Sequence, residues 1–234
     1  MKKVILTWGL SLLMFFIVAG GASASLVRFD FSGNLGDGSQ NGNTSFGTIA
    51  AGTAFSGYVL YDTDAVGNQT GTPEKGWDKM EYAFVSFYLT IGGETFSMTG
   101  NAPDDENASP YGAINITDFP NTDQFFVKIY GKKNGADFPA SYTLGGKELK
   151  SIQMAFSGKD LLNGYGTGLM DAETLQNRYE ASSRAVMSLV GTDYYTVSSN
   201  IKEAQASNVP IPGAVWLLGT GLLGLVAVRR RRRH

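Results

Sequence analysis

Two acidic loops are the candidates for binding a metal ion. Asp62 and Asp64 lie two residues apart in the first, and Asp104 and Asp105 are adjacent in the second. Calcium takes roughly six to eight oxygen ligands, and an EF-hand-type loop ends in a bidentate glutamate at about its twelfth position. Counted from Asp62, that position is Pro73. Each loop supplies only part of a calcium shell, and both also suit solvated turns. We take the four aspartates as candidate calcium ligands. The other interpretation is that the protein needs no cofactor.

Carboxylates are the main groups left for acid–base chemistry in the body of the chain. There is no cysteine, and the one histidine is the last residue, His234. This excludes from the body a histidine-activated nucleophile, a thiolate and zinc sites of the usual composition. A pair such as Glu74 and Asp78 would hydrolyse a glycosidic bond only if the two faced each other across the substrate. We therefore expect a protein that is not an enzyme. The alternative is a secreted polysaccharide-acting hydrolase that uses a carboxylate pair.

The C-terminal segment, residues 209–234, has three parts in a fixed order. It begins with Val209, Pro210, Ile211, Pro212 and Gly213, continues through uncharged residues 214–228, and reaches Arg229, Arg230, Arg231, Arg232 and Arg233. A helix over 214–228 rises about 22 Å, whereas the bilayer core is about 30 Å thick. Arginines resist translocation and stay cytoplasmic. The pattern predicts a short single transmembrane helix with the body on the outside.

The N-terminal segment has the layout of a secretory signal peptide. Lys2 and Lys3 precede an apolar stretch, and small residues close it with Ala22-Ser23-Ala24, an A-x-A cleavage pattern. We expect residues 1–24 to be removed, with cleavage specified by Ala22 and Ala24. The body is therefore predicted to be exported.

The C-terminal motif resembles the PEP-CTERM sorting signal, in the variant written VPLPA. Ile211 stands where that variant has leucine, and Gly213 where alanine is commoner. The resemblance covers residues 209–234 and implies a Gram-negative host. It further implies processing near Pro210–Gly213 by an exosortase, a membrane-embedded transpeptidase-like enzyme. The implied route is a transient inner-membrane intermediate and then the cell surface or extracellular matrix, in association with exopolysaccharide and biofilm.

Charge narrows the range of partners for the body. The chain has 19 basic and 21 acidic residues. Two lysines and five arginines lie in the end segments, which carry no acid, so residues 25–208 hold 12 bases and 21 acids, a formal charge of −9. An acidic surface argues against nucleic acid and anionic lipid headgroups as partners, because both require a basic face. Without cysteines, the body must be stabilised by its hydrophobic core alone.

The elements that must position these residues are predicted to be β-strands. Alternating or β-rich runs cover residues 26–31, 55–61, 82–91, 94–98, 113–117, 124–130, 151–156, 186–190 and 194–197. Gly92-Gly93 predicts a tight hairpin, and Asp171 is the expected N-cap of one short helix over 171–179. Many short strands with almost no helical periodicity favour an all-β, antiparallel two-sheet sandwich or jelly roll. Trp77, Tyr82 and Tyr88 could stack on sugar rings or pack between the sheets.

These patterns divide the chain into four parts and leave two hypotheses for its function. We expect a signal peptide over 1–24, a secreted β domain over 25–200, a linker over 201–208 and the sorting signal over 209–234. The favoured hypothesis is a non-catalytic surface or matrix protein that binds polysaccharide, and the second is the hydrolase. A flat aromatic face would support the first hypothesis, and a facing carboxylate pair in a groove the second.

Overall fold

The computed structural model describes the body of the chain with short gaps. The described residues are 26–38, 42–71, 78–100, 111–119, 122–130, 143–159, 161–162, 167–191 and 195–209. The predicted signal peptide and the sorting segment from Pro210 onward lie outside them, as do Asp104 and Asp105. Residues Leu26–Asn208 form a compact unit of their own. Among the described residues, no helix combines the length and apolar character needed to cross a bilayer.

The body consists of β-strands and one described α-helix. The elements in chain order are β1 (Leu26–Asn34), β2 (Ala54–Asp62), β3 (Asn68–Gln69), β4 (Asp78–Tyr82), β5 (Ser86–Ile91), β6 (Glu94–Thr99), β7 (Tyr111–Asp118), β8 (Asp123–Tyr130), β9 (Thr143–Leu144), β10 (Lys147–Gly158), α2 (Ala172–Ala181), β11 (Arg184–Gly191) and β12 (Thr196–Asn208). The predicted all-β antiparallel class is confirmed.

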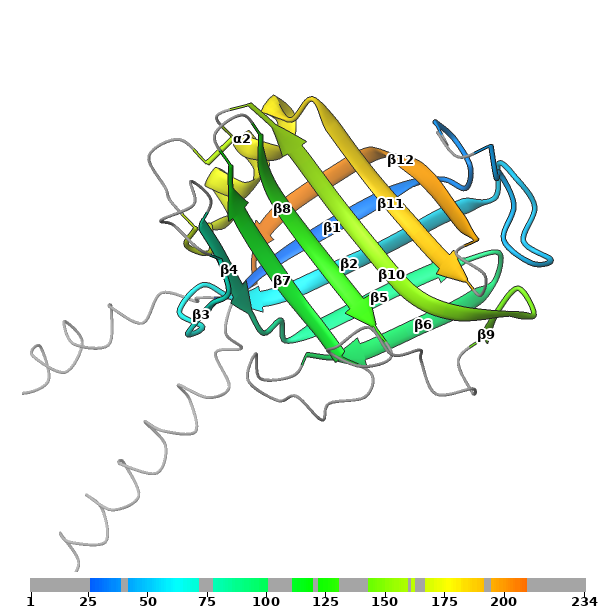
Figure 1. Cartoon of the computed structure of the whole chain (residues 1–234), viewed down its shortest axis with the longest axis horizontal. Helices are drawn as coiled ribbons and strands as arrows, with labels where there is room; N and C mark the ends of the chain where they lie inside the picture. The colour runs from blue at the N-terminus through cyan, green and yellow to red at the C-terminus, as the bar shows by residue number, and fades with distance from the viewer. Residues whose placement is uncertain are drawn as a thin grey trace, which may run out of the picture. The chain divides into compact units, whose positions relative to one another are not determined.

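The strands form one continuous sheet that curls over itself. Their order is β3-β4-β7-β8-β10-β11-β12-β1-β2-β5-β6, and β9 pairs with β10 off this path. In Figure 1 the diagonal strands β7, β8, β10 and β11 cross in front of β1, β2 and β5, so the two halves of the sheet face each other. Side chains alternate across each strand, and the inward sets of the two halves meet in a shared core.

Strand β12 joins the two halves, which is where the structure departs from the predicted pair of separate sheets. Its first residues, Thr196–Asn200, pair with β11, whereas Ile201–Asn208 pair with β1. The β1 register shifts between Ser32 and Gly33 at this crossing. A Cβ on Gly33 would lie 2.4 Å from the Asn200 carbonyl oxygen. Because only glycine permits this approach, Gly33 allows one strand to serve both halves.

The β12 pairing also corrects the predicted linker over residues 201–208. These residues form strand along β1, and the helix covers their other side. The side-chain oxygen of Gln176 in α2 accepts from the Ala206 N–H at 2.8 Å, and its amide nitrogen donates to the Ala204 carbonyl at 3.4 Å. Gln176 thus replaces a neighbouring strand where β11 has ended, which protects an edge that would otherwise expose unpaired backbone groups.

The core is rich in aromatic side chains, and α2 closes one end of it. Phe156 stacks on Phe125 with ring centroids 4.8 Å apart and lies 5.8 Å from Phe29. Tyr179 of α2 meets Phe29 and Phe156 edge-on. The predicted N-cap of the helix is confirmed, since Asp171 accepts the Thr174 N–H at 2.7 Å. The interlocked rings fix the helix against the end of the curled sheet.

Two further sequence predictions have different outcomes. The hairpin at Gly92-Gly93 is confirmed, with φ of +59° and +82° between β5 and β6. The predicted continuous strand over 82–91 is instead broken at residues 83–85. There the chain leaves the β4–β7 pair and crosses to the β2–β5 pair, and the Val85 N–H donates to the Leu60 carbonyl at 2.7 Å. Both pieces are apolar on one side, so their alternation does not reveal the crossing.

Candidate functional site

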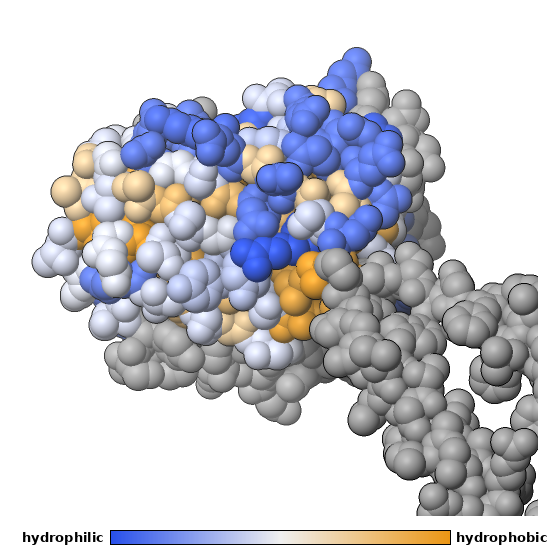
Figure 2. Space-filling model, turned by 180° about the vertical axis from the view of Figure 1, so that it is seen from behind, coloured by the Kyte–Doolittle hydropathy of each residue, from blue (hydrophilic) through white to orange (hydrophobic). Residues whose placement is uncertain are grey.

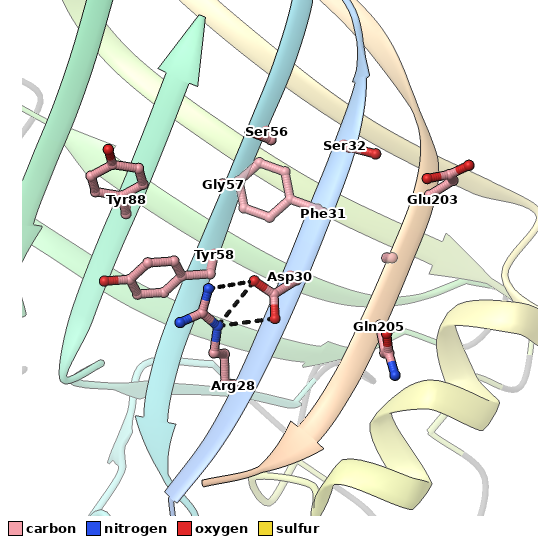
Figure 3. A pocket seen from close by; sticks show the side chains of 11 residues that line it. Arg28, Asp30, Phe31, Ser32, Ser56, Gly57, Tyr58, Tyr88, Glu203 and Gln205 are labelled. Carbon is pink, nitrogen blue, oxygen red and sulfur yellow. Dashed lines mark hydrogen bonds and ion pairs between the residues drawn. The ribbon is translucent and has the colours of Figure 1, made fainter.

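A groove of about 430 Å³ lies on the outer face of the sheet, over β12, β1, β2 and β5. Its lining includes outward side chains of these strands, while the inward ones fill the core. The labelled lining residues in Figure 3 are Arg28, Asp30, Phe31, Ser32, Ser56, Gly57, Tyr58, Tyr88, Glu203 and Gln205. Seen from this side, the surface is largely pale or blue, with one orange patch beside the grey atoms and smaller orange areas elsewhere (Figure 2). The face is therefore mainly polar.

A row of planar groups lines one part of the groove. Tyr58 and Tyr88 are direct cross-strand partners in the β2–β5 pair. Their rings are nearly parallel, with an interplanar angle of 11° and centroids 5.5 Å apart. The Arg28 guanidinium carbon lies 4.0 Å from the Tyr58 ring centre, on the neighbouring strand β1. Cross-strand aromatic pairs and cation–π contacts both stabilise such a row, so three strands hold these groups in a defined arrangement.

Asp30 fixes the guanidinium in place. The Arg28 Nη2 atom lies 2.7 Å from Asp30 Oδ1, and Nε donates to both carboxylate oxygens at 3.0 Å. The two residues are two apart on β1 and so point to the same face. Their side chains remain 43% and 44% exposed. Hydrogen bonding to Asp30 is the main reason that the pKa of Arg28 is raised. The pair presents hydrogen-bonding groups at the surface with its formal charges balanced.

The polar groups around this row come from the flanking strands. Ser32 of β1 pairs with Ser56 of β2 and with Glu203 of β12, and Asp30 pairs with Gln205. Hydroxyl, carboxylate and amide groups therefore line the groove beside the tyrosines. Aromatic surface next to convergent hydrogen-bonding groups suits a ligand with apolar faces and a rim of hydroxyls.

The calcium candidates that the structure describes form a turn. Asp62 ends β2, and its Oδ1 accepts the Asp64 N–H at 3.0 Å in an exposed position. Within the described ranges, no group of three or more His, Cys, Asp or Glu residues could hold a metal ion. Asp104 and Asp105 lie outside these ranges, as do Ala22, Ala24 and the motif residues beyond Val209. The geometry at Asp62 is that of an Asx turn, which matches the backbone role considered above.

The geometry of the candidate carboxylate pair, Glu74 and Asp78, is not described, because Glu74 lies outside the described residues. Asp78 accepts from the Thr167 hydroxyl at 3.1 Å. It is the cross-strand partner of Asp118, whose pKa is raised first by partial burial and then by its interaction with Asp123. Asp123 also accepts the Leu162 N–H at 2.6 Å.

A second polar cluster lies on the outer face of the β4–β7–β8 half. The buried Tyr111 hydroxyl donates to Glu81, and Lys79 lies 4.0 Å from the same carboxylate. Burial lowers the pKa of Lys128 and raises that of Tyr130 to about 12. These opposite directions share one cause, since burial favours the neutral form of each group. Glu81 and Tyr111 are buried, whereas Lys79, Lys128 and Tyr130 are partly exposed.

The three aromatic residues that the sequence suggested for sugar stacking differ in their positions in the structure. Tyr82 is in the core, 6% exposed, and its hydroxyl donates to the Thr167 carbonyl at 2.9 Å. Trp77 lies outside the described residues, and Tyr88 lines the groove. Sequence reasoning missed Tyr58 and Arg28. Their signal was present, because both occupy the outward positions of alternating strands, where a large planar side chain has no core to fill.

Comparisons with known proteins give no relative from which to extend this description. No protein-family model matches the chain, and neither a curated protein nor a solved structure matches it.

Proposed function

We propose that the chain is an exported, non-catalytic surface or matrix protein whose β domain binds polysaccharide through the groove on β12, β1, β2 and β5. The observation that carries the proposal is the row formed by Arg28, Tyr58 and Tyr88, which lies at a groove on a polar sheet face. Calcium has no assigned part in this binding.

The chemistry of the groove favours a sugar over other ligands. A pyranose ring has an apolar C–H face that packs on aromatic side chains and a rim of hydroxyls that seek hydrogen bonds. Tyr58 and Tyr88 supply aromatic surface, while Arg28, Asp30 and Gln205 supply donors and acceptors. The body charge of −9 opposes nucleic acid and anionic lipid surfaces. An uncharged, hydroxyl-rich polymer meets no such repulsion.

Affinity electrophoresis of the full chain through gels that contain candidate polysaccharides tests this proposal. Replacing Tyr58 or Tyr88 with alanine removes an aromatic contact and is expected to weaken binding roughly tenfold, the scale of 1.4 kcal/mol. Phe119→Ala is the control, because Phe119 is 37% exposed and does not line the groove. Equal retardation of the parent and both tyrosine variants would refute the site.

Export and sorting are proposed from the two end segments. The signal-peptide pattern over 1–24 and the PEP-CTERM-like segment over 209–234 support secretion followed by exosortase processing. Intact-mass measurement of the protein from its host is expected to give a start at Ser25 and loss of Arg229–Arg233. Replacing those arginines with serine should cause release or mis-sorting of a folded body. Mature surface protein with the complete tail would overturn the sorting proposal.

One observation favours the hydrolase alternative, since Asp30 and Glu203 both line the groove. A glycosidase acid is kept protonated, commonly by an apolar environment. Asp30 instead accepts three hydrogen bonds from a guanidinium, and Glu203 is exposed. This supports a binding role over catalysis. Release of reducing sugars from a bound polysaccharide, abolished in Glu203→Gln, would replace the binding proposal with the alternative.

A further inference from the structure

We propose that the groove holds several consecutive sugar units of a linear, uncharged polysaccharide that runs along β1, and not an isolated sugar. The inference rests on the proposed function and specifies its ligand. It comes from the extent and the charge of the groove beyond the tyrosines.

Three hollows follow one another on this face. The groove at Tyr58 and Tyr88, of about 430 Å³, shares Ser32, Ser56 and Glu203 with a second hollow of about 470 Å³. The second shares Asn34 and Lys202 with a third, of about 420 Å³. Because each hollow shares lining residues with the next, the three lie in a row from Arg28 past the end of β1, and we call this row the depression.

Strand geometry explains the shape and the length of this depression. The outward side chains after Asp30 are short, namely Ser32 and Asn34 on β1 and Ser56 and Ala54 on β2. The six residue steps from Arg28 to Asn34 cover about 20 Å at roughly 3.3 Å per residue. This length exceeds that of one sugar ring. Several rings in an extended chain would therefore lie on the floor beyond the tyrosines.

The charges along the depression are mostly paired with one another. Arg28 is bonded to Asp30, and Lys202 Nζ lies 2.8 Å from an Asp37 carboxylate oxygen. Within the described part of the chain, Glu203 has no ion-pair partner, and it lies between these two pairs in the lining. A carboxylate-bearing polymer would have to displace Asp30 or Asp37 and would meet Glu203. Hydroxyl groups can use all of these side chains without such a penalty.

The test is a length series measured by isothermal titration calorimetry on the full chain in a mild detergent. The probes are the disaccharide, tetrasaccharide and hexasaccharide of the neutral glucan, mannan, galactan or xylan that the chain binds best. We expect affinity to rise by about tenfold or more from the disaccharide to the hexasaccharide, because more of the depression is filled. A uronic-acid polymer should bind more weakly than the neutral one.

Groove-blocking variants locate the binding of the additional sugar units. Ala54 lines only the second hollow and Ala51 only the third, and both are exposed. Ala54→Phe and Ala51→Trp should lower the affinity for the hexasaccharide towards that for the disaccharide and leave disaccharide binding unchanged. Gln124→Phe on β8, which belongs to the other half of the sheet, is the matched control.

The outcomes separate this inference from the proposed function. Binding that Tyr58→Ala weakens, but that is equal for all lengths and insensitive to both blocking variants, overturns the inference and leaves the function. Preference for the uronic-acid polymer also overturns it. Failure of every polysaccharide to bind, or binding that both tyrosine variants retain in full, overturns the proposed function itself.

Discussion

The adjacent residues Phe125 and Phe126 allow a sharp test of the fold, because they point to opposite faces of β8. Phe125 is 0% exposed and stacks on Phe156 at 4.8 Å. Phe126 is partly exposed on the outer face, where the Lys128 ammonium lies 4.4 Å from its ring centre. Truncation to alanine removes the same atoms at both positions. The difference in the free energy of unfolding therefore reports which face of the strand is buried.

The expected magnitudes are well separated. Phe125→Ala leaves a cavity in the shared core and should cost about 3–5 kcal/mol, a large part of the roughly 5–15 kcal/mol that stabilises a typical domain. Phe126→Ala loses a partly exposed contact and one cation–π interaction, which should cost about 1 kcal/mol or less. At about 2–4 °C per kcal/mol for a domain of this size, Phe125→Ala should lower Tm by about 6–20 °C.

The assay is urea denaturation monitored by circular dichroism, with thermal melting in parallel. An unchanged m value would assign the difference to stability. Phe125→Leu provides a milder change if the alanine variant does not fold. Equal losses at the two positions, or a larger loss at Phe126, would refute the reasoning, because a one-residue slip of β8 exchanges its two faces.

Three further predictions concern the ends of the body, its pH dependence and one buried hydrogen bond. A chain that stops after Asn200 loses the part of β12 that pairs with β1 and should be unfolded by circular dichroism, whereas one that stops after Asn208 should fold. Partial burial and neighbouring carboxylates raise the pKa of Asp118, so the stability that this residue contributes falls as pH rises from about 3.8 through the raised pKa. Asp118→Asn should therefore become more stable relative to the parent as pH rises across that window. A constant difference between the two proteins in urea titrations from pH 3 to 7 would contradict this. Tyr61→Phe removes the 2.7 Å hydrogen bond to the buried Met170 carbonyl and should cost about 1–3 kcal/mol in the same assay, so an unchanged midpoint would count against it.

Local features of the fold follow from the sequence because their causes are local. Alternation in residues 26–31 and 124–130 places one face of β1 and β8 inside, and Gly92-Gly93 supplies the positive φ that the hairpin requires. The cap at Asp171 needs only a side-chain acceptor ahead of the helix.

The continuity of the sheet does not follow from the sequence, since it depends on which strand lies beside β12. Residues 201–208 are polar and weakly patterned, and only their pairing with β1 and the contact with Gln176 make them strand. The groove could not be predicted from the sequence for a related reason. Tyr58 and Tyr88 are distant in sequence, and their contact requires β2 and β5 to be neighbours in the observed register. Pairing between distant strands sets both features.

The pairing of β1 with β12 determines how force applied to the ends of these strands loads the hydrogen bonds between them. Val27 is the partner of Asn208, so both ends of the body lie at the same end of this ladder. Under the proposed sorting and binding, tension from beyond Asn208 would act along β12, while a polymer in the groove would pull on β1 and β2. The interstrand hydrogen bonds are perpendicular to the strands and are therefore loaded in shear, together. The strands must therefore slide past each other as a unit before the body can extend.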